Sequence, residues 1–299
     1  MKRWIMKYHR LLACALLSFF VAVATCWASA IGKWQEKAAD GDADAQLELS
    51  RAYYYGRGVE KRPAEALAWA KKSAENGNAE AMEGLGFLYS KGQGIDHDEK
   101  EAALWYRRAA EAGRSRAMLN LGILLRQSKQ LKNSPDESMQ WIEKAVEQGD
   151  PDARSFLGQL LFLGDQYQMP DYGKSVPLLR ASAEAGDPVA QNLLGLSLRD
   201  HLGSQRDPEE ATKWFRAAAR QDNPKAQANL GRILGGTRPG SAMDTEGLAW
   251  LLLAKKQDEP TAKKSLDLLE AAIPPAKLLA AEKMADQLAG EIAAAGKSQ

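Results

Sequence analysis

The sequence contains little that could support thiol or metal chemistry. Among its 299 residues there are only two cysteines, Cys14 and Cys26, and both lie within the first 30 positions. The rest of the chain can therefore form no disulfide and offers no thiolate to a metal or a substrate. Beyond position 30 the only histidines are His97 and His201, and neither has a spaced His, Cys or carboxylate partner of the kind that binds zinc. We expect no metal and no cofactor.

Sequence motifs of catalysis are missing as well. The chain has no Gly-x-Ser-x-Gly elbow and no Walker loop. Carboxylate pairs such as Glu209-Glu210 fall near an expected helix start, where they interact favourably with the helix dipole. No pattern indicates two carboxyl groups held face to face in a cleft, as general acid–base catalysis requires. We predict that the protein is not an enzyme.

The chain also lacks a strong charge of either sign. It has 40 basic and 39 acidic residues, and the formal net charge is +1. Four of the basic residues lie in the first ten positions, so the remainder has 36 basic and 39 acidic residues and a net charge of −3. This mild negative balance gives no electrostatic reason to bind nucleic acid or an anionic membrane surface. A hydrophobic content of 45% excludes wholesale disorder.

The N-terminal residues have the pattern of an export sequence. A short basic stretch is followed by Leu11–Ile31, which is uncharged and apolar, and Ala28-Ser29-Ala30 fits the small-x-small rule for signal peptidase. We predict a signal peptide over residues 1–30. Two alternatives remain open: an uncleaved anchor, since about 20 apolar residues can span a bilayer, and a lipoprotein modified at Cys26. In each case the basic flank stays inside and the body is exported, so we expect a periplasmic protein.

A period of 36 or 37 residues runs through the rest of the chain. A small residue follows each polar turn at this interval: Ala45, Ala81, Ala117, Ala153, Ala190, Ala226 and Ala262. A leucine–glycine pair repeats in the same frame, ending at Gly86, Gly122, Gly158, Gly195 and Gly231. Six of the eight tryptophans share the frame too: Trp34, Trp69, Trp105, Trp141, Trp214 and Trp250. We interpret these tryptophans as packing residues between helix pairs, not as a platform for a sugar or peptide.

Each repeat has the pattern of two helices. In the second repeat, Ala79–Ser90 and Asp98–Ala112 have apolar or small residues at helical spacing, Gly92-Gln93-Gly94 separates them, and Gly113 ends the second. A single pair of this length cannot bury its apolar stripe, so neighbouring pairs must stack into one continuous core. The glycines of the leucine–glycine pairs would let helix backbones approach closely. These features predict an all-α protein.

The repeats resemble the Sel-one-like repeat (SLR) family, a relative of the tetratricopeptide repeats. Ala74–Ile95 reads AENGNAEAMEGLGFLYSKGQGI and Glu101–Ala110 reads EAALWYRRAA, both close to the family pattern. The resemblance covers roughly Gly32 to Ala272 and implies a right-handed α-α superhelical solenoid of about six to seven helix pairs. We assign residues 31–272 to the solenoid. We assign residues 273–299 to a C-terminal capping helix, expected over Ala276–Ala294, and a tail.

The resemblance also implies an adaptor in which the first helix of each pair lines a concave groove. Carried onto this chain, the groove positions are Arg51, Tyr54, Phe87, Ile123, Arg126, Gln159, Phe162, Arg199 and Arg232. Exposed aromatics and arginines are the residue types enriched in binding hot spots. We therefore predict a non-catalytic scaffold of the cell envelope that binds another exported protein or a peptide. A periplasmic immunity protein that neutralises a toxic effector, and a cell-wall enzyme, remain as alternatives.

Overall fold

The computed structural model describes residues 30–92, 95–131, 134–235, 244–269 and 273–296, and every regular element within these ranges is an α-helix. This confirms the all-α prediction. By its internal contacts the chain divides into two compact units, Met1–Asp150 and Pro151–Gln299. Apart from Ala30, the predicted signal peptide lies outside the described residues.

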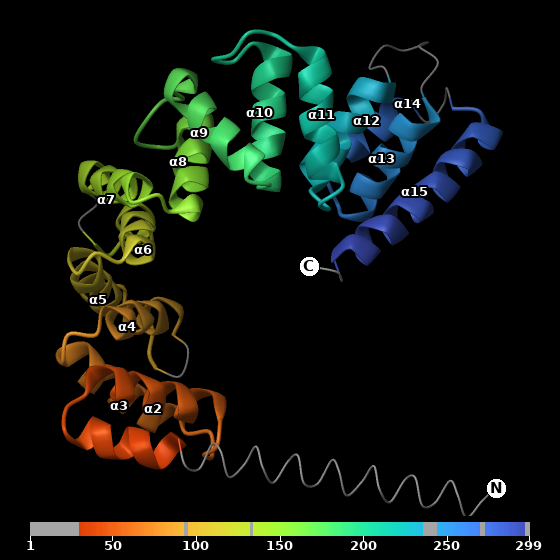
Figure 1. The fold of residues 1–299 in the computed structure, drawn as a ribbon. Helices are drawn as coiled ribbons and strands as arrows, with labels where there is room; N and C mark the ends of the chain where they lie inside the picture. Colours follow the sequence, from red (N-terminus) through yellow and green to blue (C-terminus); the bar gives the residue numbers. More distant parts are fainter. Residues whose placement is uncertain (1–29, 93–94, 132–133, 236–243, 270–272, 297–299) are drawn as a thin grey trace, which may run out of the picture. The chain divides into compact units, whose positions relative to one another are not determined.

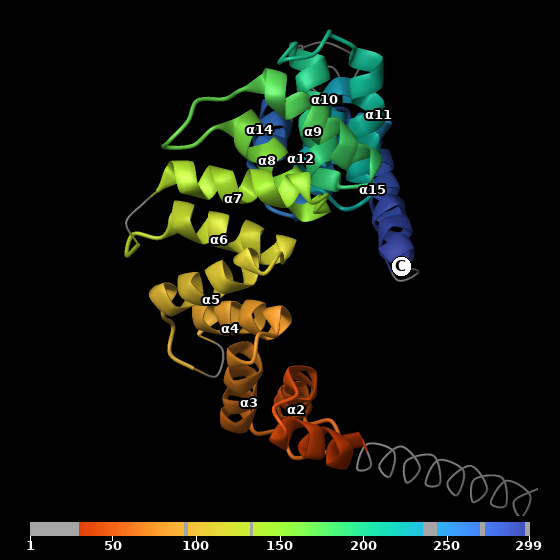
Figure 2. The ribbon, with the colours of Figure 1, turned by 60° about the vertical axis from the view of Figure 1, so that its left-hand side comes forward.

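The first unit is a stack of helix pairs (Figures 1 and 2). A helix over residues 30–39 comes first, and three pairs follow it along the chain. The two helices of a pair pack against each other, and α3 contacts α4 as α5 contacts α6, so the pairs form a continuous α-α solenoid. The pairs are α2 (Ala43–Tyr55) with α3 (Pro63–Glu75), α4 (Ala79–Lys91) with α5 (Glu99–Glu111), and α6 (Ser115–Gln127) with α7 (Pro135–Glu147).

The second unit repeats this arrangement and ends in a long helix. Its pairs are α8 (Pro151–Leu163) with α9 (Tyr172–Glu184), α10 (Pro188–Asp200) with α11 (Pro208–Ala219), and α12 (Pro224–Gly235) with α13 (Thr245–Lys256), followed by α14 (Pro260–Leu269) and α15 (Pro275–Gly296). Helix α15 packs against α13, where Ala281 and Ala285 are buried in a cluster with Leu248 and Leu251. A helix therefore lies where the sequence predicts the capping helix, and it covers apolar side chains of α13.

Side-chain caps and left-handed residues set the helix ends. Asp42 and Asn78 accept hydrogen bonds from the backbone N–H groups of Ala45 and Ala81, which have no intrahelical partner. Helices α2 and α4 end at glycines with φ of 71° and 64°, as expected for a residue without a Cβ atom. At the end of α10 the same left-handed conformation is taken by His201, with φ of 59°. The loop histidine identified from the sequence is thus part of a helix terminus.

The repeated glycines bring the two helices of each pair together. A Cβ atom on Gly86 would lie 2.5 Å from the Tyr106 ring, and one on Gly122 would lie 2.5 Å from Ile142 Cγ1. In the first repeat Ser50 takes the glycine position, and its hydroxyl donates a hydrogen bond of 2.8 Å to the Ala66 carbonyl. The expectation that these glycines permit close backbone approach is confirmed, and the approach is within a pair.

The tryptophans lie mostly at the edge of the core. Trp105 and Trp250 are buried, whereas Trp69, Trp141 and Trp214 are only half-buried. The residue that follows the tryptophan is the more deeply buried one, as Ile142 after Trp141 shows. Three of the indoles donate to a glutamate one turn earlier, and an arginine of the preceding second helix binds that glutamate. The three sets are Arg107, Glu137 and Trp141; Arg180, Glu210 and Trp214; and Arg216, Glu246 and Trp250. These contacts tie consecutive second helices together.

Candidate functional site

A pocket of about 640 Å³ lies in the first unit. Helices α2, α3 and α4 and the start of α6 form its wall, so residues far apart in sequence meet there. The lining residues are Leu47, Ser50, Arg51, Tyr54, Tyr55, Pro63, Ala66, Leu67, Ala70, Glu80, Ala81, Glu83, Gly84, Phe87, Leu88, Ile95, Arg114, Arg116 and Asn120. The pocket exists because α2, α4 and α6, the first helices of three successive pairs, present equivalent faces to the same side.

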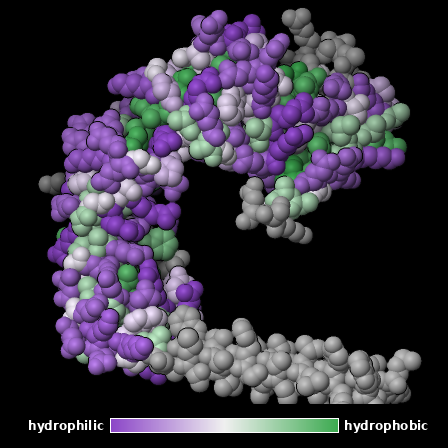
Figure 3. All heavy atoms as spheres, in the orientation of Figure 1, coloured by the Kyte–Doolittle hydropathy of each residue, from purple (hydrophilic) through white to green (hydrophobic). Residues whose placement is uncertain are grey.

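One side of the pocket is aromatic. Tyr55 is 59% exposed and Phe87 is 43% exposed, which are high values for such large side chains. The Tyr54 and Tyr55 rings meet edge to face at 5.0 Å, and the Arg57 guanidinium lies 4.6 Å from the Tyr55 ring centre. Figure 3 shows apolar residues interrupting the mainly hydrophilic surface of this unit. Neighbouring exposed aromatic rings of this kind indicate an interaction surface.

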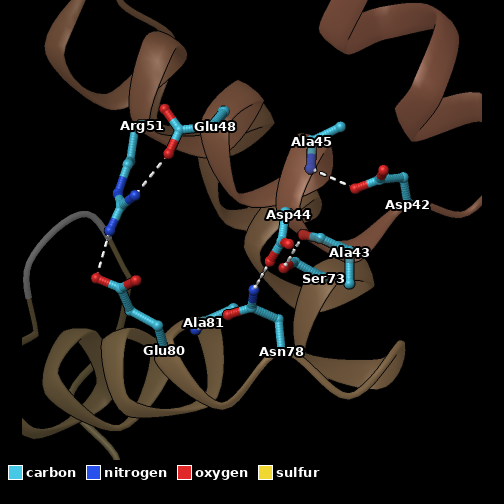
Figure 4. Close-up of polar contacts among 10 residues, drawn as sticks. All are labelled: Asp42, Ala43, Asp44, Ala45, Glu48, Arg51, Ser73, Asn78, Glu80 and Ala81. Atoms are coloured by element: carbon cyan, nitrogen blue, oxygen red, sulfur yellow. Dashed lines mark hydrogen bonds and ion pairs between the residues drawn. The ribbon is translucent and has the colours of Figure 1, made fainter.

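The other side of the pocket is charged. Arg51 Nη1 lies 2.6 Å from Glu48 Oε1 on the same helix, and Arg51 Nη2 pairs with Glu80 at the start of α4, as Figure 4 shows. Burial acts to lower the pKa of Arg51, but the Glu48 hydrogen bond and the two glutamate charges outweigh it and raise the pKa. Arg51 is therefore a fixed positive charge beside the aromatic rings. At the α6 end, Arg114 Nε and Nη2 each lie 2.8 Å from Glu83 Oε2.

Three of the nine predicted groove residues line this pocket: Arg51, Tyr54 and Phe87. Ile123 is half-buried and Arg126 is only 6% exposed, and neither of these α6 residues is part of the lining.

The other four predicted residues belong to the second unit. Phe162 is 5% exposed and packs edge to face on Tyr172 at 5.2 Å, so it is a core residue. Gln159 donates to the Ser155 hydroxyl, and Arg199 binds Asp200 and Asn229. Arg232 is half-buried on α12. Phe162 and Arg126 are thus buried in their own units, and the role of the nine positions in binding a partner stays a prediction.

The sequence prediction missed several lining residues. Leu47, Glu83 and Asn120 lie three or four residues before the predicted positions Arg51, Phe87 and Ile123. Residues three or four apart share one face of a helix, so the repeat frame already contained this information. The α3 residues and Arg114 could not be identified in that way, because their place in the wall depends on how the pairs pack.

The described part of the chain shows no arrangement typical of a metal centre. No group of three or more His, Cys, Asp or Glu side chains lies close enough together there to hold a metal ion. Among the same residues, no helix has the length and apolarity needed to cross a bilayer.

Helix pairs stacked in this way define a helical-repeat protein. The Sel1 repeat model matches residues 43–78, 79–113, 115–150, 151–187, 188–223 and 224–259, so the chain belongs to the Sel1 repeat family. This confirms the resemblance drawn from the sequence. Proteins built from Sel1 repeats are scaffolds for protein interactions.

Solved structures of this family are similar to the chain. An SLR-fold protein from uropathogenic Escherichia coli strains, described as a protective antigen, is 28% identical with a TM-score of 0.77. The alignment covers 89% of this chain and 57% of that protein, so this chain spans little more than half its length. A Sel1 repeat protein from Oxalobacter formigenes is 32% identical with a TM-score of 0.62, over 76% of this chain and 95% of that one.

A more distant similarity involves an immunity protein from Pseudomonas aeruginosa. It is 20% identical with a TM-score of 0.41, over 74% of this chain and 83% of that protein. This similarity is too low to bear on the choice between a scaffold and an immunity role. A comparison with curated proteins gave no match.

Proposed function

We propose that the protein is a non-catalytic interaction scaffold of the cell envelope, and that the pocket of the first unit binds a segment of another exported protein. The observation that carries the proposal is the meeting of Tyr54, Tyr55 and Phe87 with the fixed charge of Arg51 in one pocket of about 640 Å³. Aromatic and arginine side chains are the residues that most often dominate protein interfaces.

The exposed rings offer enough surface for specific binding. Covering Tyr55 and Phe87 would remove roughly 100 Å² of apolar surface from each ring, or about 2.5 kcal/mol per ring at ~25 cal/mol per Å². Arg51 is held on both sides by glutamates, so little side-chain freedom remains to be lost when a partner contacts it. Binding by a preorganised surface loses less entropy than binding by a mobile one.

Export to the periplasm is supported by the N-terminal sequence alone. The basic start, the uncharged stretch Leu11–Ile31 and the Ala28-Ser29-Ala30 site together match a cleavable signal peptide. The test is the N-terminus of the protein isolated from a periplasmic fraction, which should begin at Ile31. An intact Met1, or a lipid on Cys26, would instead support the anchor or the lipoprotein alternative.

The binding proposal is tested with a phage-displayed library of random linear peptides and the purified protein. Selected peptides should bind the wild-type protein and lose affinity for Tyr54→Ala and Phe87→Ala. Leu279→Ala is a matched control, because Leu279 is an exposed apolar residue on α15 outside the pocket. Peptides that bind all four proteins equally, or a library that yields no binder, would contradict the assignment of the pocket.

A further inference from the structure

A glycine in the pocket wall has no structural cause among the described residues. Gly84 lies in the middle of α4 and is exposed, and a Cβ atom built on it would meet no atom within 4 Å. Gly86 on the same helix differs, because a Cβ atom there would collide with Tyr106. An exposed glycine inside a helix is less stable than alanine at that position. Packing among the described residues therefore does not explain why residue 84 has no side chain.

The position of Gly84 relates it to the pocket. It lines the wall next to Glu83 and one turn before Phe87. At the equivalent positions, 36 residues earlier and later, the neighbouring first helices carry Glu48 and Asn120. The missing side chain thus leaves a notch in α4, between positions on α2 and α6 that are filled.

The charges of the lining indicate what kind of group completes the site. Arg51 is bound by two glutamates, Glu48 and Glu80, whereas Arg114 at the α6 end of the lining is bound by one, Glu83. The Nε and Nη2 atoms of Arg114 both contact the Glu83 carboxylate. A guanidinium has five N–H donors, so Arg114 retains donors on Nη1 for a second carboxylate. The α6 end of the pocket is therefore complementary to an acidic group.

We propose that Gly84 is the point where the main chain of an extended acidic partner segment crosses α4. The segment places an apolar side chain on the rings of Tyr54 and Phe87 and a carboxylate at Arg114. The opening left by one missing methyl group suits a flat peptide unit in contact with the helix, and any side chain at position 84 lifts that unit away. This inference rests on the proposed function of the pocket, and it adds the chemistry of the occupant and the place where its main chain crosses α4.

The experiment compares three variants of the purified protein, using a synthetic copy of the tightest peptide selected from the random library. Gly84→Ala and Gly84→Leu fill the notch, and Gly290→Ala is the matched control. Gly290 also lies exposed within a helix, α15, where a Cβ atom would meet nothing within 4 Å. Both alanine variants should raise the melting temperature, because alanine favours the helix, and this shows that the variants fold.

Binding should separate the variants. Gly84→Ala should lower the affinity for the peptide about tenfold, and Gly84→Leu should lower it further. Gly290→Ala should leave the affinity unchanged. Replacing the peptide's carboxylate side chain by its amide should weaken binding to the wild type but not to Arg114→Gln. If Gly84→Leu binds as tightly as wild type while Phe87→Ala does not, the pocket assignment stands and the crossing point at Gly84 is wrong. If neither substitution changes binding, both proposals are overturned.

Discussion

Adding one methyl group at Gly122 should test the packing of the helix pairs most directly. A Cβ atom there would lie 2.5 Å from Ile142 Cγ1 and 2.9 Å from the Ser138 carbonyl oxygen, whereas ordinary contacts are 3.4–4 Å. Ile142 is fully buried and the Ser138 oxygen is backbone, so neither can move away freely. Because both neighbours are fixed, we take the highest typical cost of overpacking, about 3 kcal/mol. Alanine regains about 1 kcal/mol through its higher helix propensity. Gly122→Ala should therefore lower the unfolding free energy by about 2 kcal/mol.

Urea titration followed by far-UV circular dichroism measures the effect, and hydrogen exchange locates it. The amides of α6 and α7 should exchange faster in Gly122→Ala, because each repeat is stabilised by its neighbours. Gly84→Ala is the internal control, since the same methyl group meets no atom within 4 Å there and should stabilise the protein by up to about 1 kcal/mol. A Gly122→Ala protein as stable as wild type would show that the close approach of α6 and α7 is not as described.

Three further predictions concern the cap, the glutamate network and the last helix. Asp98 accepts hydrogen bonds from two backbone N–H groups of α5, so Asp98→Ala should lower the unfolding free energy in urea by about 1 kcal/mol. The hydrogen bond from Arg180 holds the pKa of Glu210 below its ordinary 4.5. The ionised carboxylate therefore stabilises the folded state above pH 4.5, and this stabilisation is lost as the pH falls through the folded-state pKa. Equal acid dependence of the melting temperature in wild type and Glu210→Gln would refute this. Ala281→Asp should place a charge in the apolar contact between α15 and α13 and speed proteolysis within residues 275–296, whereas the exposed Lys283→Asp should not.

The repeat frame predicted the helices well because their limits are local. Asn78 caps α4 through Ala81, and Gly92 ends the helix in a left-handed conformation, and both interactions involve residues only a few positions apart. The sequence also indicated the capping helix, expected over Ala276–Ala294 and observed as α15, Pro275–Gly296.

The functional surface was less predictable because it depends on contacts between elements. Positions in one frame have different surroundings: Tyr54 lines the pocket, whereas Phe162 packs on Tyr172 at the start of the second helix of its pair. The frame could not show which of the two would be buried.

The period, the helix pairs, their caps and the glycines at which helices meet can all be read from the spacing of residues along the chain. The pocket in the first unit cannot, because it forms only where α2, α3, α4 and α6 pack together. The packing also distinguishes two glycines of α4: the space beside Gly84 is open and forms a notch in that wall, whereas the space beside Gly86 is filled by the Tyr106 ring. Both distinctions depend on which side chains from other helices occupy the space beside a residue, and spacing along one helix does not contain that information.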